Sequence, residues 1–199
     1  SADITDRFLA QLGTSKSGKG TCVQDRNQIS QFEAMIAPHL DAAYNLARWL
    51  MHNDQDAEDM VQEACLRALK FFSGFRGADS RAWLLTIVRN TCYTWLRQHR
   101  AHELAVPLDT DSYNVDCDAF NPEMIVQRSA DSQRLRQALE ELPVEFREVI
   151  VLRELEGLPY KAIANIADIP IGTVMSRLAR ARRRLQQSLA DQHDEGGAA

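Results

Sequence analysis

The chain has 199 residues, 45% of them hydrophobic, and a formal net charge of −5 at pH 7. This length suits one large domain or two small ones, and the negative charge excludes a general polyanion binder, so DNA or RNA binding would need local basic patches or a partner. No apolar run is long enough to span a bilayer and no signal-peptide pattern is present, so we expect a cytoplasmic protein without membrane insertion.

Residues 1–28 are predicted to form a flexible extension, because Gly, Ser and Lys dominate residues 14–20. The helical period then begins at Ile29 and continues to Leu50, with apolar residues three and four positions apart. Asn53 is a candidate N-cap for the helix that follows.

That second helix is expected over residues 55–72, and a loop with two glycines, residues 73–79, separates it from a third helix over residues 80–100. Trp83, near the start of the third helix, is ambiguous between the core and a surface that stacks on a base. The core is favoured, because an aromatic residue at helical spacing is more often buried.

Acidic residues, prolines and the absence of any period mark residues 101–130. Such a stretch is long for a loop within one domain, and its composition is typical of a flexible linker. We therefore predict two small helical domains, at residues 29–100 and 131–190, with a flexible tail at residues 191–199. No strand pattern occurs, so the predicted fold class is all-α.

The second domain shows a helix-turn-helix pattern. Pro143 marks a helix boundary, and the next helix stops near Gly157. Pro159 opens a short helix, residues 167–169 form a turn, and a long Arg-rich helix follows. A short helix, a tight turn and a longer basic helix are the elements of many DNA-binding domains.

This last helix is predicted to have two chemically different stripes. The apolar stripe comprises Val174, Leu178, Ala181 and Leu185, and the polar stripe comprises Thr173, Ser176, Arg177, Arg180 and Arg184. Hydroxyls and guanidiniums suit phosphates and base edges in a DNA major groove. The alternative is a solvated surface helix, which usually mixes Glu with Arg.

The four cysteines give no strong metal or redox signal. Cys22, Cys65, Cys92 and Cys117 include no CxxC pair and no spacing typical of a zinc site. No nucleophile–base pair or phosphate-binding loop is evident either. The sequence therefore predicts no metal, no cofactor and no enzymatic activity.

Two blocks of sequence carry a family resemblance. The first comprises DAEDMVQEA at residues 56–64, FRG at 75–77 and WLLTIVRN at 83–90. The second comprises LEELP at residues 139–143, LRELEGL at 152–158 and IGTVMSR at 171–177. Together they resemble the bacterial RNA polymerase sigma factors of the extracytoplasmic-function (ECF) group. The resemblance implies sigma region 2 in the first domain and sigma region 4 in the second.

A member of this family directs core RNA polymerase to specific promoters, usually under the control of an anti-sigma factor. Region 2 docks its second helix on the polymerase β′ subunit and engages the minus-ten element, where an extruded base needs stacking surfaces and hydrogen bonds. The resemblance assigns core-polymerase binding to Asp59, Gln62 and Glu63, and minus-ten binding to Phe75, Arg76, Asn90, Arg97 and Arg100.

Region 4 binds the minus-thirty-five element as duplex DNA. The resemblance assigns these contacts to Thr173, Met175, Ser176, Arg177, Ala179, Arg180 and Arg184, while Arg182 projects away from them. Relatives often carry a basic residue where this chain has Met175, and an acid where it has Thr94. The expected partners are core polymerase (β′ and β subunits), promoter DNA and an anti-sigma factor.

Two alternatives stay open at this point. A sigma-like decoy would bind an anti-sigma factor without reading DNA, and would have lost its basic face. The intact stripe of Arg177, Arg180 and Arg184, together with Asn90, argues against a decoy. A stand-alone helix-turn-helix repressor would account only for the last third of the chain.

Overall fold

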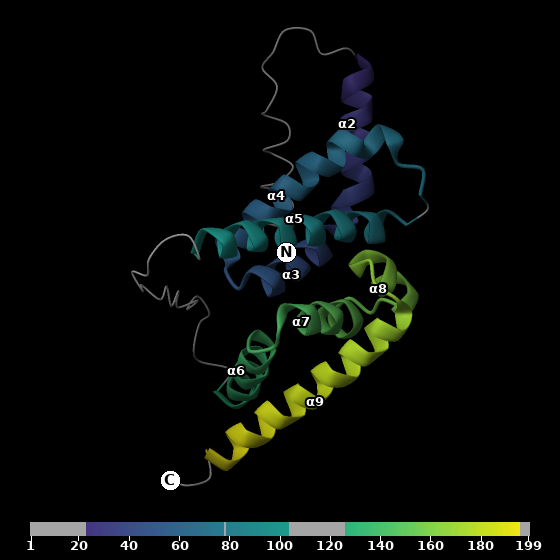
Figure 1. The fold of residues 1–199 in the computed structure, drawn as a ribbon. Coiled ribbons are helices and arrows are strands. Elements are labelled where there is room, and N and C mark those ends of the chain that lie inside the picture. Colours follow the sequence, from purple (N-terminus) through teal and green to yellow (C-terminus); the bar gives the residue numbers. More distant parts are fainter. Residues whose placement is uncertain (1–22, 78, 104–125, 196–199) are drawn as a thin grey trace. The chain divides into compact units, whose positions relative to one another are not determined.

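The computed structural model describes residues 23–77, 79–103 and 126–195, and within these ranges the chain forms helices and no strand (Figure 1). The helices make two compact units, one N-terminal and one C-terminal. The predicted all-α class with two small helical domains is confirmed. The predicted flexible extension and tail, and most of the predicted linker, lie outside the described residues.

The N-terminal unit contains two helices where one continuous period was expected. Its elements are α2 (Val23–Ile36), η1 (Ala37–His39), α3 (Leu40–Met51), α4 (Asp54–Phe71), η2 (Phe72–Gly74) and α5 (Ser80–Glu103). Pro38 lies in the short η1 turn that interrupts the first period. Proline has no N–H to donate and disfavours a helical conformation in the residue before it, so the α-helix ends at Ile36.

The core of this unit follows the apolar period of the sequence, and α3 packs along α4. Phe32, Leu46 and Leu84 are fully buried. The Asn53 side chain accepts hydrogen bonds from the backbone N–H groups of Gln55 (2.8 Å) and Asp56 (3.3 Å). The predicted N-cap is therefore confirmed, and it fixes where α4 begins.

The C-terminal unit places a helix-turn-helix on two supporting helices. Its elements are α6 (Val126–Glu140), α7 (Val144–Ile150), the π-helical turn η3 (Val151–Leu155), α8 (Tyr160–Ala167) and α9 (Ile171–Glu195). Asp168 ends α8 in a left-handed conformation (φ 53°), which aspartate tolerates better than most residues. The long α9 runs beside α6 and α7 (Figure 1).

Arg147, at 3% exposure, joins the end of α6 to α7. Its guanidinium donates hydrogen bonds to the backbone carbonyls of Leu139 (2.9 Å), Glu140 (2.7 Å) and Leu142 (2.6 Å). Carbonyls at a helix C-terminus have no partner within the helix, and a cation there also suits the helix dipole. The buried charge is stabilised by the same bonds that terminate α6.

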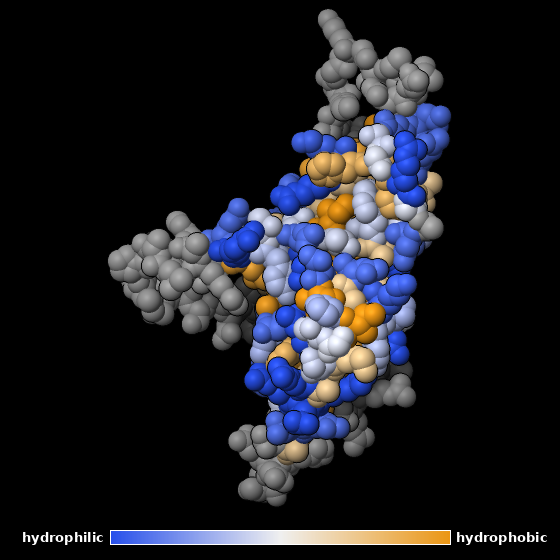
Figure 2. Space-filling view, turned by 45° about the vertical axis from the view of Figure 1, so that its right-hand side comes forward, coloured by the Kyte–Doolittle hydropathy of each residue, from blue (hydrophilic) through white to orange (hydrophobic). Residues whose placement is uncertain are grey.

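The surface of the described residues is mostly hydrophilic, with separate apolar patches on the face that Figure 2 shows. Large exposed apolar side chains include Leu66 and Phe71 on α4, and Ile171 and Met175 on α9. No helix within the described ranges is both long and apolar enough to cross a membrane.

We expect Arg147→Met to destabilise the C-terminal unit, because three backbone carbonyls, two of them in buried hydrogen bonds, lose a charged donor. The expected loss is about 3 kcal/mol of unfolding free energy. Hydrogen exchange of the α6 and α7 amides in the full chain measures it, with the exposed Arg183→Met as control. Equal exchange in both variants would contradict this role for Arg147.

Candidate nucleic-acid and protein interfaces

One face of α4 gathers the three residues predicted to bind core polymerase. Asp59, Gln62 and Glu63 lie three and four positions apart and therefore neighbour one another. Asp59 is exposed and the other two are partly exposed. The opposite face of the helix, which includes Ala57, is buried. Leu66, at 51% exposure, continues the polar face one turn further on.

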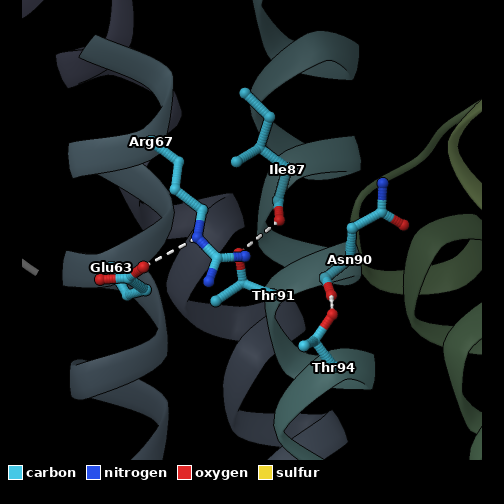
Figure 3. Close-up of polar contacts among 6 residues, drawn as sticks. All are labelled: Glu63, Arg67, Ile87, Asn90, Thr91 and Thr94. Carbon is cyan, nitrogen blue, oxygen red and sulfur yellow. Dashed lines mark hydrogen bonds and ion pairs between the residues drawn. The ribbon is translucent and has the colours of Figure 1, made fainter. Parts of the chain in front are cut away.

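Glu63 also takes part in a contact between α4 and α5 (Figure 3). Its carboxylate accepts a 2.8 Å hydrogen bond from Nε of Arg67. The Arg67 guanidinium also lies 3.5 Å from Oγ1 of Thr91 on α5, to which it donates. Thr91 is 2% exposed and donates in turn to the carbonyl of Ile87 (2.9 Å). Part of the Glu63 charge is therefore already compensated within the domain.

The loop before α5 presents an aromatic pair. The rings of Phe75 and Trp83 have centroids 4.5 Å apart and are tilted by 33°. Both side chains are partly exposed, so the preference for a core position of Trp83 is wrong. The partner that holds Trp83 near the surface is a loop residue, which helical periodicity could not reveal. Arg76, next to Phe75, is exposed.

The absence of a side chain at Gly77 leaves room for the Phe75 ring. A Cβ atom at position 77 would lie 2.9 Å from a ring carbon of Phe75, which is closer than van der Waals contact allows. A Cβ atom at Gly74, in the same loop, would meet nothing within 4 Å. The aromatic pair therefore depends on one glycine of the loop and not on the other.

One stripe of α5 continues from the aromatic pair. Trp83, Asn90 and Arg97 are seven residues apart, so they share a helix face, and Asn90 and Arg97 are exposed. The Asn90 side-chain oxygen accepts a hydrogen bond from Arg89 (3.2 Å). Thr94 donates to the Asn90 backbone carbonyl (2.7 Å; Figure 3). The side chain of Arg100 lies outside the described residues.

The first residues of α9 separate into buried and exposed sides as the sequence predicts. Val174, Leu178 and Ala181 are at most 1% exposed, whereas Leu185 is only partly buried. On the outer side, Ser176, Arg180 and Arg184 are exposed, and Thr173 and Arg177 are partly exposed.

Two arginines of α9 have partners within the C-terminal unit. Arg182 donates to Glu154 of η3 at 2.6 Å, in agreement with its predicted position away from the polar stripe. The Arg184 guanidinium lies over the Phe146 ring, 5.2 Å from its centroid. Arg184, a predicted DNA-contacting residue, is thus also used in packing, and Arg180 is the more available cation.

Two family models match the two units. The model for sigma-70 region 2 matches residues 35–102, and that for sigma-70 region 4 matches residues 132–185. The chain is 30% identical over 169 residues to the RNA polymerase sigma-H factor of Pseudomonas aeruginosa, covering 79% of this chain and 86% of that protein. The ECF RNA polymerase sigma-E factor of Haemophilus influenzae is 33% identical over 151 residues, covering 72% of this chain and 79% of that protein. The chain is an ECF sigma factor.

A further curated relative is the ECF RNA polymerase sigma factor SigE of Mycolicibacterium smegmatis, 33% identical over 172 residues. That alignment covers 86% of this sigma factor and 66% of the length of the relative. Among solved structures, the sigma factor RpoE of Bartonella quintana, in complex with the anti-sigma factor NepR, is 30% identical with a TM-score of 0.63. The match covers 80% of this chain and 97% of the RpoE chain.

The fold of this sigma factor thus groups the predicted residues by helix face. It brings the predicted core-binding residues together on one face of α4. The predicted minus-thirty-five residues all lie on α9, outside its buried stripe. Sequence reasoning missed Arg67, Thr91 and the exposed Leu66. The Glu63–Arg67 spacing of four residues could have predicted their ion pair on a helix. No local sequence pattern predicts the contact of Arg67 with Thr91.

The described part of the chain shows no metal site and no disulfide. Among the described residues, no three His, Cys, Asp or Glu side chains are grouped so as to hold a metal ion. Cys65 and Cys92 are buried and lie outside any disulfide. Burial raises the pKa of Cys65 to about 12, which leaves its thiol protonated and unreactive at neutral pH.

We expect Gly77→Ala to displace the Phe75 ring from Trp83, because the added methyl group occupies the position of the ring. The NMR signals of the Trp83 side chain, which sense the ring current of Phe75, should shift. Gly74→Ala is the matched control and should leave these signals in place. Identical spectra for both variants would show that the loop does not hold the aromatic pair.

Proposed function

We propose that this ECF sigma factor binds core RNA polymerase through region 2 and directs it to promoters that regions 2 and 4 recognise. One observation carries the proposal: α9 buries an apolar stripe and presents Ser176, Arg177 and Arg180 outward. No acidic residue occurs from residue 169 to residue 190. A helix of this kind fits the major groove, where arginine bonds to guanine and to phosphates.

Region 2 supplies the second DNA surface of the proposal. Phe75 and Trp83 offer aromatic faces on which an unpaired base can stack. Asn90 and Arg97 continue this surface along α5 and supply an amide and a cation for base edges and phosphates. Arg76 and Arg100 complete the proposed minus-ten site. The exposure of Asn90 and Arg97 supports this assignment.

Core polymerase binding is proposed for the outer face of α4. Asp59 is exposed, whereas Glu63 is partly exposed and paired with Arg67. Gln62 adds an amide donor and acceptor. Leu66 supplies an exposed apolar side chain beside these polar groups, an arrangement that suits an anchor at a protein interface. The partner surface would be basic at its rim, which fits a polymerase helix rich in Arg or Lys.

Control by an anti-sigma factor completes the proposal, supported by the Bartonella quintana relative, which was solved with one. We place region 2 at residues 29–100 and region 4 at residues 131–190, and the protein in the cytoplasm as a binding subunit without catalysis. The decoy alternative is not favoured, because α9 presents exposed cations such as Arg180 with no acidic residue among them, which DNA binding explains and a decoy does not require.

We expect Arg180→Ala to weaken promoter binding by the complete holoenzyme about tenfold, the loss of one good contact to a base. The alternative substitution Arg177→Ala should act in the same direction, but Arg177 is partly buried and Arg180 is the cleaner probe. Competition binding of promoter DNA at fixed salt measures the change. Arg182→Ala, which removes only an exposed ion pair with Glu154, should have little effect.

Binding to core polymerase, measured in the same preparations, provides the internal control. Arg180→Ala should leave this binding unchanged, whereas Asp59→Asn should reduce it while the chain stays folded. Equal losses of core binding and promoter binding in the Arg180→Ala variant would indicate a damaged fold and would contradict the proposed division of labour.

A further inference from the structure

The recognition helix α9 carries a second exposed row that its arginines do not explain. Ile171, Met175 and Ala179 lie four residues apart and form a single ridge on the helix surface. Ile171 is 45% exposed, Met175 is 53% exposed and Ala179 is exposed. Large apolar side chains of this kind are unusual in the open parts of a helix that otherwise presents cations.

This apolar row lies on one flank of α9. The cationic row, which comprises Arg177, Arg180 and Arg184, lies on the opposite flank. With about 100° of rotation per residue, Met175 lies about 100° from the buried Val174 in one direction, and Arg180 about 120° in the other. Ser176 falls between them, at the outermost point of the helix. Both rows can therefore enter one groove together.

Charge is also distributed unequally between the two flanks. The next cation on the apolar flank is Arg182, two turns beyond Met175, and it is held by Glu154 at 2.6 Å. No acidic residue of α9 precedes Asp191, so the helix still favours a polyanion. The surroundings of the row therefore match a polyanion such as DNA better than a basic or neutral protein surface.

The major groove exposes one prominent apolar group, the C5 methyl of thymine. Helix-turn-helix proteins place the N-terminal residues of the recognition helix against base edges, and Ile171 is the first residue of α9. Methionine is flexible and polarisable, which suits contact with a single methyl group. The Ile171 side chain has no hydrogen-bonding group, and the Met175 thioether is only a weak acceptor, so both favour apolar contact over hydrogen bonds to a base edge.

We propose that Met175, supported by Ile171, contacts the thymine methyl group in the minus-thirty-five duplex and so selects an A·T pair at that position. This inference rests on the proposed function and adds a specificity determinant to it. The cationic row would fix helix register on the phosphates and on a guanine, while the apolar row would discriminate thymine from cytosine on the other side of the groove.

The test uses the complete holoenzyme and promoters that it selects from a randomised DNA library. Each thymine of the selected minus-thirty-five element is then replaced by deoxyuridine, which pairs identically and lacks only the C5 methyl. We expect about fourfold weaker binding at one or two positions, the effect of exposing about one methyl group. Met175→Ala should bind the thymine promoter more weakly and should no longer distinguish thymine from uracil at that position.

Arg182→Ala, on the same flank, should keep the full sensitivity to uracil. Wild-type binding that is indifferent to every uracil, a selected element without A·T pairs, or unchanged uracil sensitivity in Met175→Ala would overturn the methyl contact. Loss of core binding in Met175→Ala without any uracil effect would assign the row to a protein partner instead. Failure to select any promoter would overturn the proposed function itself.

Discussion

The burial of one narrow stripe of α9 is the constraint on which the recognition surface depends. Val174, Leu178 and Ala181 pack into the C-terminal unit, where α9 runs along α6 and α7. Because successive residues of a helix are about 100° apart, this stripe fixes the direction of every other side chain. A rotation by one residue would bury Met175 or Thr173 in place of Val174. Arg147 makes the supporting surface rigid, since it ties the end of α6 to α7.

The charge of the whole chain and the charge of α9 have opposite effects on the affinity of the protein for DNA. A net charge of −5 opposes DNA binding in general, whereas α9 offers a local cationic row. Strong sequence-independent affinity is therefore not expected from the free protein. Two DNA-contacting surfaces on one chain, brought to a promoter by a polymerase that itself binds DNA, add their effects through a raised effective concentration. Selectivity rather than affinity is then the main contribution of each surface.

The sequence predicts the helices well because their apolar residues repeat with the period of a helix. The N-cap at Asn53 and the buried stripe of α9 are local features of this kind. Arg147 could not be foreseen, because an arginine in a helix usually marks the exposed side, and only the carbonyls of a different helix explain its burial. Trp83 was misplaced for the same reason, since its partner Phe75 belongs to a loop.

In the candidate sites too, contacts between different helices could not be predicted from local sequence patterns. Family motifs point to Glu63 as a binding residue, but its pairing with Arg67 and the link to Thr91 depend on the packing of α4 against α5. Met175 stands out in the sequence only as a departure from a basic residue. Its exposed row with Ile171 becomes visible once the phase of α9 is known, and this phase is set by the buried stripe.

Transcription from a pool of DNA templates by purified core polymerase, with and without this chain, tests the central claim most directly. The 5′ ends of the transcripts, mapped by sequencing, show where initiation occurs. We expect the chain to create a set of start sites that share two upstream sequence elements, at about the spacing of the minus-ten and minus-thirty-five regions. The same distribution of start sites with and without the chain would contradict its role as a promoter-specificity subunit.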